Sequence, residues 1–315
     1  MSVEQPPAAD LVTTACPLCG GEDGRFVRTV DGYTLERCRG CGLVFNNPRL
    51  SDAALDKVYS DRDTEGLIAF YQRMHTPAVL GQFDVKLGRA ERRMPRKGRL
   101  LDFGCGAGYF LQRAQQRGWD AEGVELGPWA AEAARRRGVP NLHTARLQDR
   151  KYPDGHFDVV NASQVFEHLT HPLPELAEIR RVLKPGGLFL IDVPNYHTLP
   201  ILLGVDDFML NAPPQHVAFY TPRTLRKLLA AGGFAVERVF TSSGLKWENL
   251  LGRPIRSDIA SAHTAADGVP PPPKPQRTGG LLGGVKRAVR GLVIDPLFYR
   301  LWKVGMLLEA EARKG

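Results

Sequence analysis

Residues 100–110 read LLDFGCGAGYF, in which an apolar run leads into three glycines at alternate positions and then into the start of a helix. Because glycine has no Cβ atom, such a turn can be tight and lets the backbone come close to a ligand. The spacing differs from the GxGxxG pattern of dinucleotide-binding loops, and it does not match the lysine-bearing phosphate loop. The stretch therefore predicts a strand, a ligand-binding turn and a helix.

Short apolar runs alternate with helical runs from residue 99 to residue 242. This alternation is typical of parallel βαβ units. We therefore predict a Rossmann-like, doubly wound α/β fold, with a mostly parallel sheet and helices on both faces. A seventh strand cannot be placed from the pattern. The six strands that can be placed are residues 100–103, 121–124, 142–144, 157–162, 188–193 and 234–240.

An acid ends the second of these predicted strands, about 20 residues after the glycine turn. This acid is Glu125. A carboxylate at this place can accept hydrogen bonds from both hydroxyls of a ribose. For the glycines taken alone, an ordinary strand-to-helix turn is the competing interpretation.

Three later segments follow the loop, and they read KYPDGHFDVV at residues 151–160, FEHL at residues 166–169 and LKPGG at residues 183–187. Together with the loop they resemble the class I S-adenosylmethionine-dependent methyltransferases, most closely the ubiquinone-type O-methyltransferases and their relatives with a zinc ribbon. The resemblance covers residues 40–242. It implies that the glycine loop wraps the methionine end of the cofactor and that Glu125 holds the ribose.

The resemblance also implies a set of cofactor-binding residues in the loop and at the strand ends. The residues expected to contact the adenine differ from the family pattern. The family often has an acid near the end of the third strand, whereas residues 145–148 of this chain read ARLQ. The implied set is Asp102, Gly104, Cys105, Gly106, Gly108, Tyr109, Glu125, Leu126, Leu147, Gln148, Ser163 and Gln164. Within it, Cys105 is expected to be a small loop residue and not a nucleophile.

Four of the five cysteines form two CxxC pairs near the start of the chain. The spacing of Cys16, Cys19, Cys38 and Cys41 suits a four-thiolate zinc site with a β-hairpin between the pairs. Four thiolates leave no coordination position open, so we expect Zn²⁺ to serve structure or docking and not catalysis. A redox-active thiol pair is the alternative.

Candidate catalytic residues follow the fourth and fifth predicted strands. Ligands of open α/β sheets bind beyond the carboxyl ends of the strands, where His168 and His216 would project. Either histidine could act as the base for a hydroxyl acceptor, with Glu167 orienting His168, and a purely structural role is the alternative. In ubiquinone-type enzymes another glutamate usually stands three residues before the Glu-His pair. Here that position is Gln164, which disfavours a metal ion at this site.

Composition changes divide the chain into five expected segments: a zinc ribbon (1–50), a helical connector (51–97), the methyltransferase domain (98–242), a Pro/Gly-rich linker (243–280) and a basic amphipathic helix (281–315). The apolar stretch 195–214 is expected to cover the acceptor, with an ordinary packed segment as the alternative. The last segment could lie on a membrane surface or pack on the protein.

Charge and hydropathy bear on partners and location. The net charge is +8, but residues 281–315 hold seven basic and three acidic residues and so carry half of the excess. A nucleic-acid groove on the main body is therefore not indicated. Residues 1–11 have no basic start and no apolar run, and no stretch reaches the roughly 20 uncharged residues that span a bilayer, so we expect neither secretion nor a membrane span. We therefore expect a cytoplasmic protein, and peripheral contact at the inner membrane face through residues 281–315 is left open.

The sequence thus favours an S-adenosylmethionine-dependent methyltransferase with a small-molecule acceptor, and O-methylation of a sugar, lipid-linked glycan or natural-product intermediate is the first choice. C-methylation of a nucleotide sugar is close behind, and methylation of tRNA or protein is more distant. A non-catalytic scaffold is the alternative of a different class. The sequence leaves the oligomeric state open.

Overall fold

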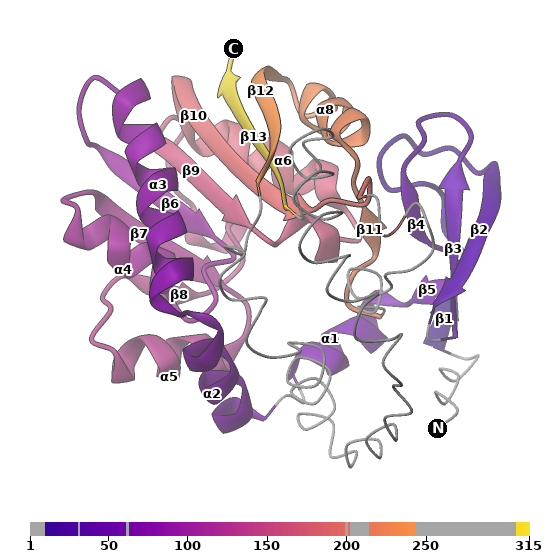
Figure 1. The fold of residues 1–315 in the computed structure, drawn as a ribbon, viewed down its shortest axis with the longest axis horizontal. Coiled ribbons are helices and arrows are strands. Elements are labelled where there is room, and N and C mark those ends of the chain that lie inside the picture. The colour runs from indigo at the N-terminus through magenta and orange to yellow at the C-terminus, as the bar shows by residue number, and fades with distance from the viewer. Residues whose placement is uncertain (1–9, 31, 61–62, 199–200, 202–213, 243–306) are drawn as a thin grey trace, which may run out of the picture.

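The structure is a computed structural model that describes residues 10–30, 32–60, 63–198, 201, 214–242 and 307–315. A seven-stranded sheet with the order β12-β13-β10-β9-β6-β7-β8 forms its centre, and a four-stranded sheet with the order β11-β4-β3-β2 lies beside it (Figure 1). The strands of the large sheet are β6 (Arg99–Phe103), β7 (Asp120–Glu125), β8 (Leu142–Thr144), β9 (Phe157–Ser163), β10 (Leu183–Pro194), β12 (Phe234–Ser242) and β13 (Leu307–Lys314).

All six predicted strands are present, which confirms the doubly wound α/β fold. Strands β6 to β10 run parallel to one another. Successive apolar residues of these strands point to opposite faces, because side chains alternate along a strand. Leu100, Val159 and Leu188 therefore pack on one face, against α3 (Pro77–Arg93) and α4 (Tyr109–Gln116).

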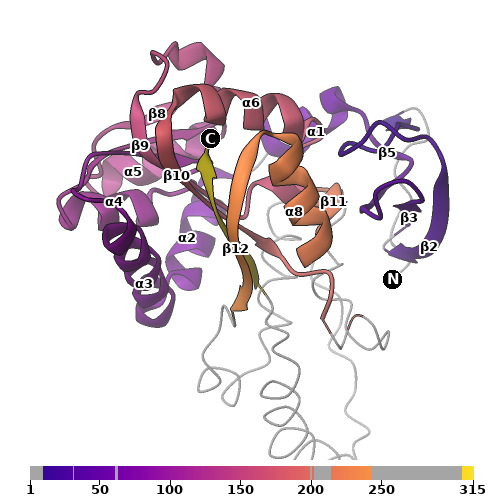
Figure 2. The same ribbon diagram turned by 90° about the horizontal axis from the view of Figure 1, so that it is seen from above.

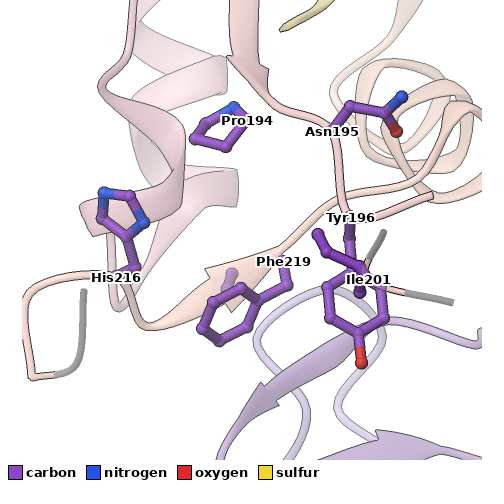
Figure 3. A pocket seen from close by; sticks show the side chains of 7 residues that line it. Pro194, Asn195, Tyr196, Ile201, His216 and Phe219 are labelled. Carbon is purple, nitrogen blue, oxygen red and sulfur yellow. The ribbon is translucent and has the colours of Figure 1, made fainter. Parts of the chain in front are cut away.

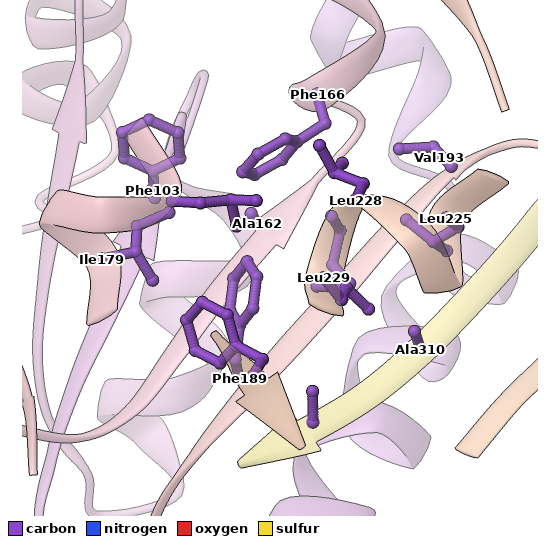
Figure 4. Packing of buried hydrophobic residues seen from close by; sticks show 14 of the residues in the cluster. Phe103, Ala162, Phe166, Ile179, Phe189, Val193, Leu225, Leu228, Leu229 and Ala310 are labelled. Carbon is purple, nitrogen blue, oxygen red and sulfur yellow. The ribbon is translucent and has the colours of Figure 1, made fainter. Parts of the chain in front are cut away.

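The other face carries the larger core, in which Phe189 and the neighbouring strands pack against α6 (Pro172–Val182) and α8 (Pro222–Ala231) (Figure 4). The sheet is thus covered on both sides, as a mostly parallel sheet requires. The remaining helices are α1 (Asp52–Ser60), α2 (Thr64–Met74) and α5 (Pro128–Arg136), together with the short 3₁₀ helices η2 (Gln148–Arg150) and η3 (Phe166–His168).

The seventh strand corrects the prediction for the end of the chain. Residues 307–314, expected to be part of an amphipathic helix, form β13, which is antiparallel to both β10 and β12 and lies between them (Figures 1 and 2). Leu308, Ala310 and Ala312 alternate along it and are fully buried. Glutamate and alanine favour helices, but long-range pairing with a strand on each side overrides that local preference.

Other expectations for the second half of the chain fall outside the described residues. These are the linker 243–280, the first part of the predicted terminal helix (281–306) and most of the stretch 195–214. Within the described part of the chain, no helix has the length and apolar character that crossing a bilayer requires.

The cysteine segment forms its own small sheet from β2 (Gly24–Val30), β3 (Tyr33–Cys38) and β4 (Val44–Asn46), next to the short ladder of β1 (Leu11–Val12) and β5 (Arg49–Leu50). The hairpin of β2 and β3 lies between the CxxC pairs, as predicted. The fourth strand, β11 (Ala218–Phe219), comes from the second half of the chain and pairs with β4. A strand from the second half of the chain therefore completes the small sheet (Figure 2).

Candidate active site

The predicted cofactor loop connects β6 to α4 and contains three glycines in the left-handed region. Gly104, Gly106 and Gly108 have φ angles of 70°, 49° and 72°. The Gly104 and Cys105 amides both donate to the Val124 carbonyl oxygen, at 2.9 and 3.1 Å, which ties the loop to the end of β7. The loop conformation thus requires the glycines that the sequence places there.

Glu125 ends β7 and faces this loop. Its carboxylate accepts hydrogen bonds from the amides of Gly106 (3.0 Å), Leu126 (2.8 Å) and Gly127 (3.2 Å). Leu126 is 56% exposed and is one of four large apolar residues on the surface of the described part of the chain. An acid at a strand end beside an uncovered apolar side chain suits a ligand with a ribose and a flat base.

A buried polar network lies below the loop, at the carboxyl ends of β6, β9 and β10. Asn161 donates to Asp102 at 2.7 Å, and Ser163 donates to Asp192 at 2.9 Å. The Lys86 ammonium, from α3, forms an ion pair with Asp192 and donates to Ser163 at 2.8 Å. Burial raises the pKa of Asp102 to about 7. A carboxyl group that changes charge near neutral pH therefore underlies the predicted cofactor site.

Sequence reasoning missed Lys86, Asn161 and Asp192. Nothing in the sequence marked Lys86 as a site residue, because a lysine in a helix of mixed polarity is usually solvated. Asp192 and Asn161 interrupt apolar strands near their carboxyl ends, and a polar residue at such a position could have been taken as a site candidate.

Gln164 is tied to the same network by its backbone and its side chain. It has a φ of 55°, and its side-chain amide donates to Asp192 at 3.0 Å. Cys105 is buried in the loop, and burial raises the pKa of its thiol well above the usual value, which agrees with a packing role. At the end of β8, Leu147 is buried and Gln148 is exposed.

The three predicted catalytic residues lie together. Glu167 is fully buried, and among the described residues neither of its carboxylate oxygens has a hydrogen-bond partner. Its Oε1 atom lies 4.0 Å from Nε2 of His168. The His168 and His216 rings are 4.7 Å apart, edge to face. The segment of η3 and the segment before β11 thus meet, as their positions after the fourth and fifth predicted strands suggested.

This trio also has the donor set of a cation site, because one ligand atom of each residue lies within 4.8 Å of the others. Burial raises the pKa of Glu167 well above its usual range, so its carboxylate needs either a proton or a neighbouring cation. Gln164, whose amide serves Asp192, takes no part. His216 would be the third ligand of such a site, in the place that the sequence had suggested only for residue 164.

A small pocket opens beside His216 (Figure 3). Asn195 and His216 are its polar lining residues. The rest of the lining is apolar or aromatic and consists of Pro194, Tyr196, Ile201, Ala218 and Phe219. Tyr196, Ile201 and Phe219 also pack against the sheet of the cysteine segment.

The four cysteines of the small sheet converge on one point. The Sγ atoms of Cys16 and Cys41 are 3.5 Å apart, as are those of Cys19 and Cys38, and all four lie within 4.8 Å of one another. Three of the four are buried. Convergent thiols of this kind fit a tetrahedral Zn²⁺ site, the donor set that the spacing predicted.

A family model described as a methyltransferase domain matches residues 82–239 of the 315. The ubiquinone biosynthesis O-methyltransferase of Roseobacter denitrificans is 30% identical over 203 residues, which are 59% of this chain and 80% of that protein. The chain belongs to the S-adenosylmethionine-dependent methyltransferase family.

Two further proteins are similar to this methyltransferase. A probable S-adenosylmethionine-dependent methyltransferase of Mycolicibacterium smegmatis is 32% identical over 151 residues, covering 46% of this chain and 56% of that protein. Among solved structures, a SAM dependent methyltransferase from Archaeoglobus fulgidus is similar over 84% of this chain and 100% of that chain, with 20% identity and a TM-score of 0.48.

Family membership makes the chain an enzyme and gives it S-adenosylmethionine as its cofactor, so the alternative of a non-catalytic scaffold is set aside. The methyltransferase site then has two parts at the carboxyl edge of the sheet. The loop and Glu125 form the predicted cofactor part, and the Glu167–His168–His216 trio forms the predicted acceptor part. The negative charge of Asp192 raises the pKa of both Asp102 and Glu167, which links the two parts electrostatically.

Helix α2 adds residues that sequence reasoning did not assign to the site. The His75 ring, directly after α2, stacks on Tyr109 of the loop with centroids 4.0 Å apart, and Tyr71 packs against Trp129 at 4.7 Å. A Cβ on Gly106 would come within 3.2 Å of Tyr71. The helical segment before the methyltransferase domain therefore covers the cofactor loop.

Proposed function

We propose that this methyltransferase transfers the methyl group of S-adenosylmethionine to an oxygen of a small-molecule acceptor. The observation that carries the proposal is the meeting of Glu167, His168 and His216 beside the cofactor network. Methyl transfer from a sulfonium is an in-line displacement, so the protein must align acceptor, methyl group and sulfur and exclude water. A base is needed only for the proton of the acceptor hydroxyl.

The roles of the residues follow from their positions. Backbone amides of the glycine loop would hold the methionine end, Glu125 would accept hydrogen bonds from the ribose hydroxyls, and Leu126 would lie on the adenine. His216 borders the pocket and is the first candidate for the base, with His168 as the second. Glu167 would stabilise the positive charge that a histidine gains when it takes the proton.

The orphan carboxylate of Glu167 supports a second role for the trio. A divalent cation held by Glu167, His168 and His216 would neutralise the buried charge and lower the pKa of an acceptor hydroxyl bound nearby. Titration with Mg²⁺ or Mn²⁺ of the chain whose four-cysteine site is loaded with Zn²⁺, with His216→Gln as the matched variant, separates the two roles. Metal binding that is lost in His216→Gln supports the role of the trio as a cation site. If the wild type binds no metal ion, the role of a histidine as the base remains.

The acceptor is proposed to be a sugar, a lipid-linked glycan or a natural-product intermediate with an apolar part. The mainly apolar pocket beside His216 supports this proposal, and relatives named as O-methyltransferases support transfer to oxygen. C-methylation of a nucleotide sugar is the alternative. We also propose that the four cysteines hold structural Zn²⁺ and that the protein works in the cytoplasm.

Calorimetric titration with S-adenosylmethionine tests the cofactor part first. The wild type should bind, and Glu125→Ala should bind roughly 10- to 100-fold more weakly, because hydrogen bonds to a charged group contribute about 1.5–3 kcal/mol. Glu132→Ala, which removes an acid on the outer side of α5, should bind as the wild type does. A folded wild type that does not bind would disprove the assignment of this site.

A further inference from the structure

The small cysteine sheet, here called the ribbon (residues 10–50), is completed by a strand of the methyltransferase domain. Strand β11 pairs antiparallel with β4, with Ala218 opposite Phe45 and Phe219 opposite Val44. Figure 1 shows β11 beside β4, and Figure 2 shows β11 next to α8 on the side of the ribbon. The segment that carries His216 therefore enters a sheet whose other strands belong to the ribbon.

Asn46 of β4 connects the ribbon to His216. It is 1% exposed, and its side-chain amide donates to the His216 carbonyl oxygen at 2.8 Å. Its backbone amide donates to the Val217 carbonyl oxygen at 3.0 Å, while the Val217 amide donates to the Glu167 carbonyl oxygen at 2.8 Å. The backbone at residues 216–217 is thus held from both sides, by the ribbon and by η3.

The pocket beside His216 rests on the ribbon as well. Three of its lining residues, Tyr196, Ile201 and Phe219, form one buried cluster with Val30, Leu35 and Val44 of the ribbon strands. The Lys227 ammonium of α8 donates to the Cys41 carbonyl oxygen at 2.7 Å, which anchors the second CxxC pair to the same domain. The ribbon therefore contacts the acceptor part of the site, whereas the cofactor loop is covered by α2.

We propose that the ribbon supports the acceptor site by packing behind its lining residues and that Asn46 is a positioning residue for His216. The inference rests on the proposed function, because it takes His216 as part of the acceptor site. Metal in the ribbon then holds β4 in place, β4 holds residues 216–217, and these set the His216 ring against His168. Cofactor binding does not depend on this chain of contacts.

The test compares two neighbouring asparagines in the full, zinc-loaded chain. Asn46→Ala removes the bond to His216, whereas Asn47→Ala removes bonds to Glu36 and Thr14, which stay inside the ribbon. The readout is the imidazole ring resonance of His216 in ¹H–¹³C spectra, assigned by its disappearance in His216→Gln. Only Asn46→Ala should shift this resonance. A shift in both variants or in neither overturns the inference.

Binding of S-adenosylhomocysteine separates this inference from the proposed function. Both asparagine variants should bind it as tightly as the wild type does. A wild type that fails to bind contradicts the proposed cofactor site, while the His216 resonance still decides the inference. Weaker binding by Asn46→Ala alone would overturn the separation of the acceptor part from the cofactor part.

Zinc removal provides a second measurement that needs no folded Asn46→Ala variant. Chelation of the metal from the wild type should speed amide hydrogen exchange in residues 214–220, because β11 loses its ordered partner strand. The cofactor loop, residues 100–110, should keep its protection. Equal deprotection of the two segments, or unchanged exchange in residues 214–220, would show that the ribbon does not support the acceptor site.

Discussion

Lys86 and Asp192 form a buried ion pair that joins α3 to the carboxyl end of β10. Their side chains are 7% and 10% exposed, and Ser163 and Gln164 complete the hydrogen bonding of the Asp192 carboxylate. Breaking such a pair from one side leaves a desolvated charge without compensation. The connector helix α3 is therefore coupled electrostatically to the strand ends that carry the site.

Lys86→Met should lower the free energy of unfolding by about 3–5 kcal/mol, because Asp192 stays buried without its partner. Arg113→Met is the matched control, since it breaks the more exposed ion pair with Asp84 and should cost less than about 1 kcal/mol. Urea denaturation followed by circular dichroism measures both. Equal losses of stability in the two variants would mean that the buried Lys86–Asp192 pair contributes no more than the more exposed Arg113–Asp84 pair.

Asp102 makes the stability of the fold depend on pH. Its pKa is about 7 in the folded chain against an ordinary value of 3.8, so between these pH values the folded chain holds a proton that the unfolded chain has lost. Stability should therefore fall as the pH rises from about 4 to about 7. The loss is at most about 4 kcal/mol, from roughly 1.4 kcal/mol for each pH unit.

Asp102→Asn isolates this effect, because an amide cannot titrate and its oxygen can still accept the hydrogen bond from Asn161. Urea denaturation of both proteins at a series of pH values gives the difference curve. The stability of the wild type relative to the variant should decline through the window and level off above pH 7. A flat difference curve would show that Asp102 is ionised throughout.

The C-terminal strand should be essential to the core. Leu308→Ala opens a cavity at a fully buried position of β13 and should cost about 2–5 kcal/mol in the free energy of unfolding. Leu307→Ala makes the same change one residue earlier, at a position only partly buried, and should cost clearly less. Chemical denaturation of the two variants compares them. Similar losses would argue against β13 as a central strand.

Six of the seven strands could be predicted because each is a local apolar run between glycine, proline or polar residues. Strand β13 could not, because its sequence LLEAEARK contains good helix formers and it pairs with β10 and β12 across more than sixty residues of chain. Its two glutamates are compensated by Arg89 and Arg93 of α3, a contact that no local pattern reveals.

The site, too, combines features set by the local sequence with features set by long-range contacts. The loop, Glu125 and the four cysteines could be predicted, because spacing along the chain determines their geometry. Lys86 and Asn46 could not, because their roles arise from contacts with Asp192 and His216, which lie more than a hundred residues away. The predicted roles of the cofactor and acceptor residues remain predictions for the titrations described above.

Two glycines with similar backbone conformations separate strain from steric fit in the cofactor loop. Gly104 and Gly118 have φ angles of 70° and 87°, so alanine at either position should cost about 1–2 kcal/mol in stability. At Gly104 the new Cβ would also lie 2.4 Å from a methyl group of Val165, whereas at Gly118 it meets nothing within 4 Å.

Gly104→Ala should therefore displace the loop or the segment after β9 and greatly weaken S-adenosylmethionine binding, while Gly118→Ala should bind as the wild type does. Thermal unfolding checks that both variants are folded, and calorimetric titration measures the affinity. If Gly104→Ala binds normally, the contact between the loop and Val165 is not needed for the cofactor. If Gly118→Ala also loses binding, the cause is general strain and not the shape of the loop.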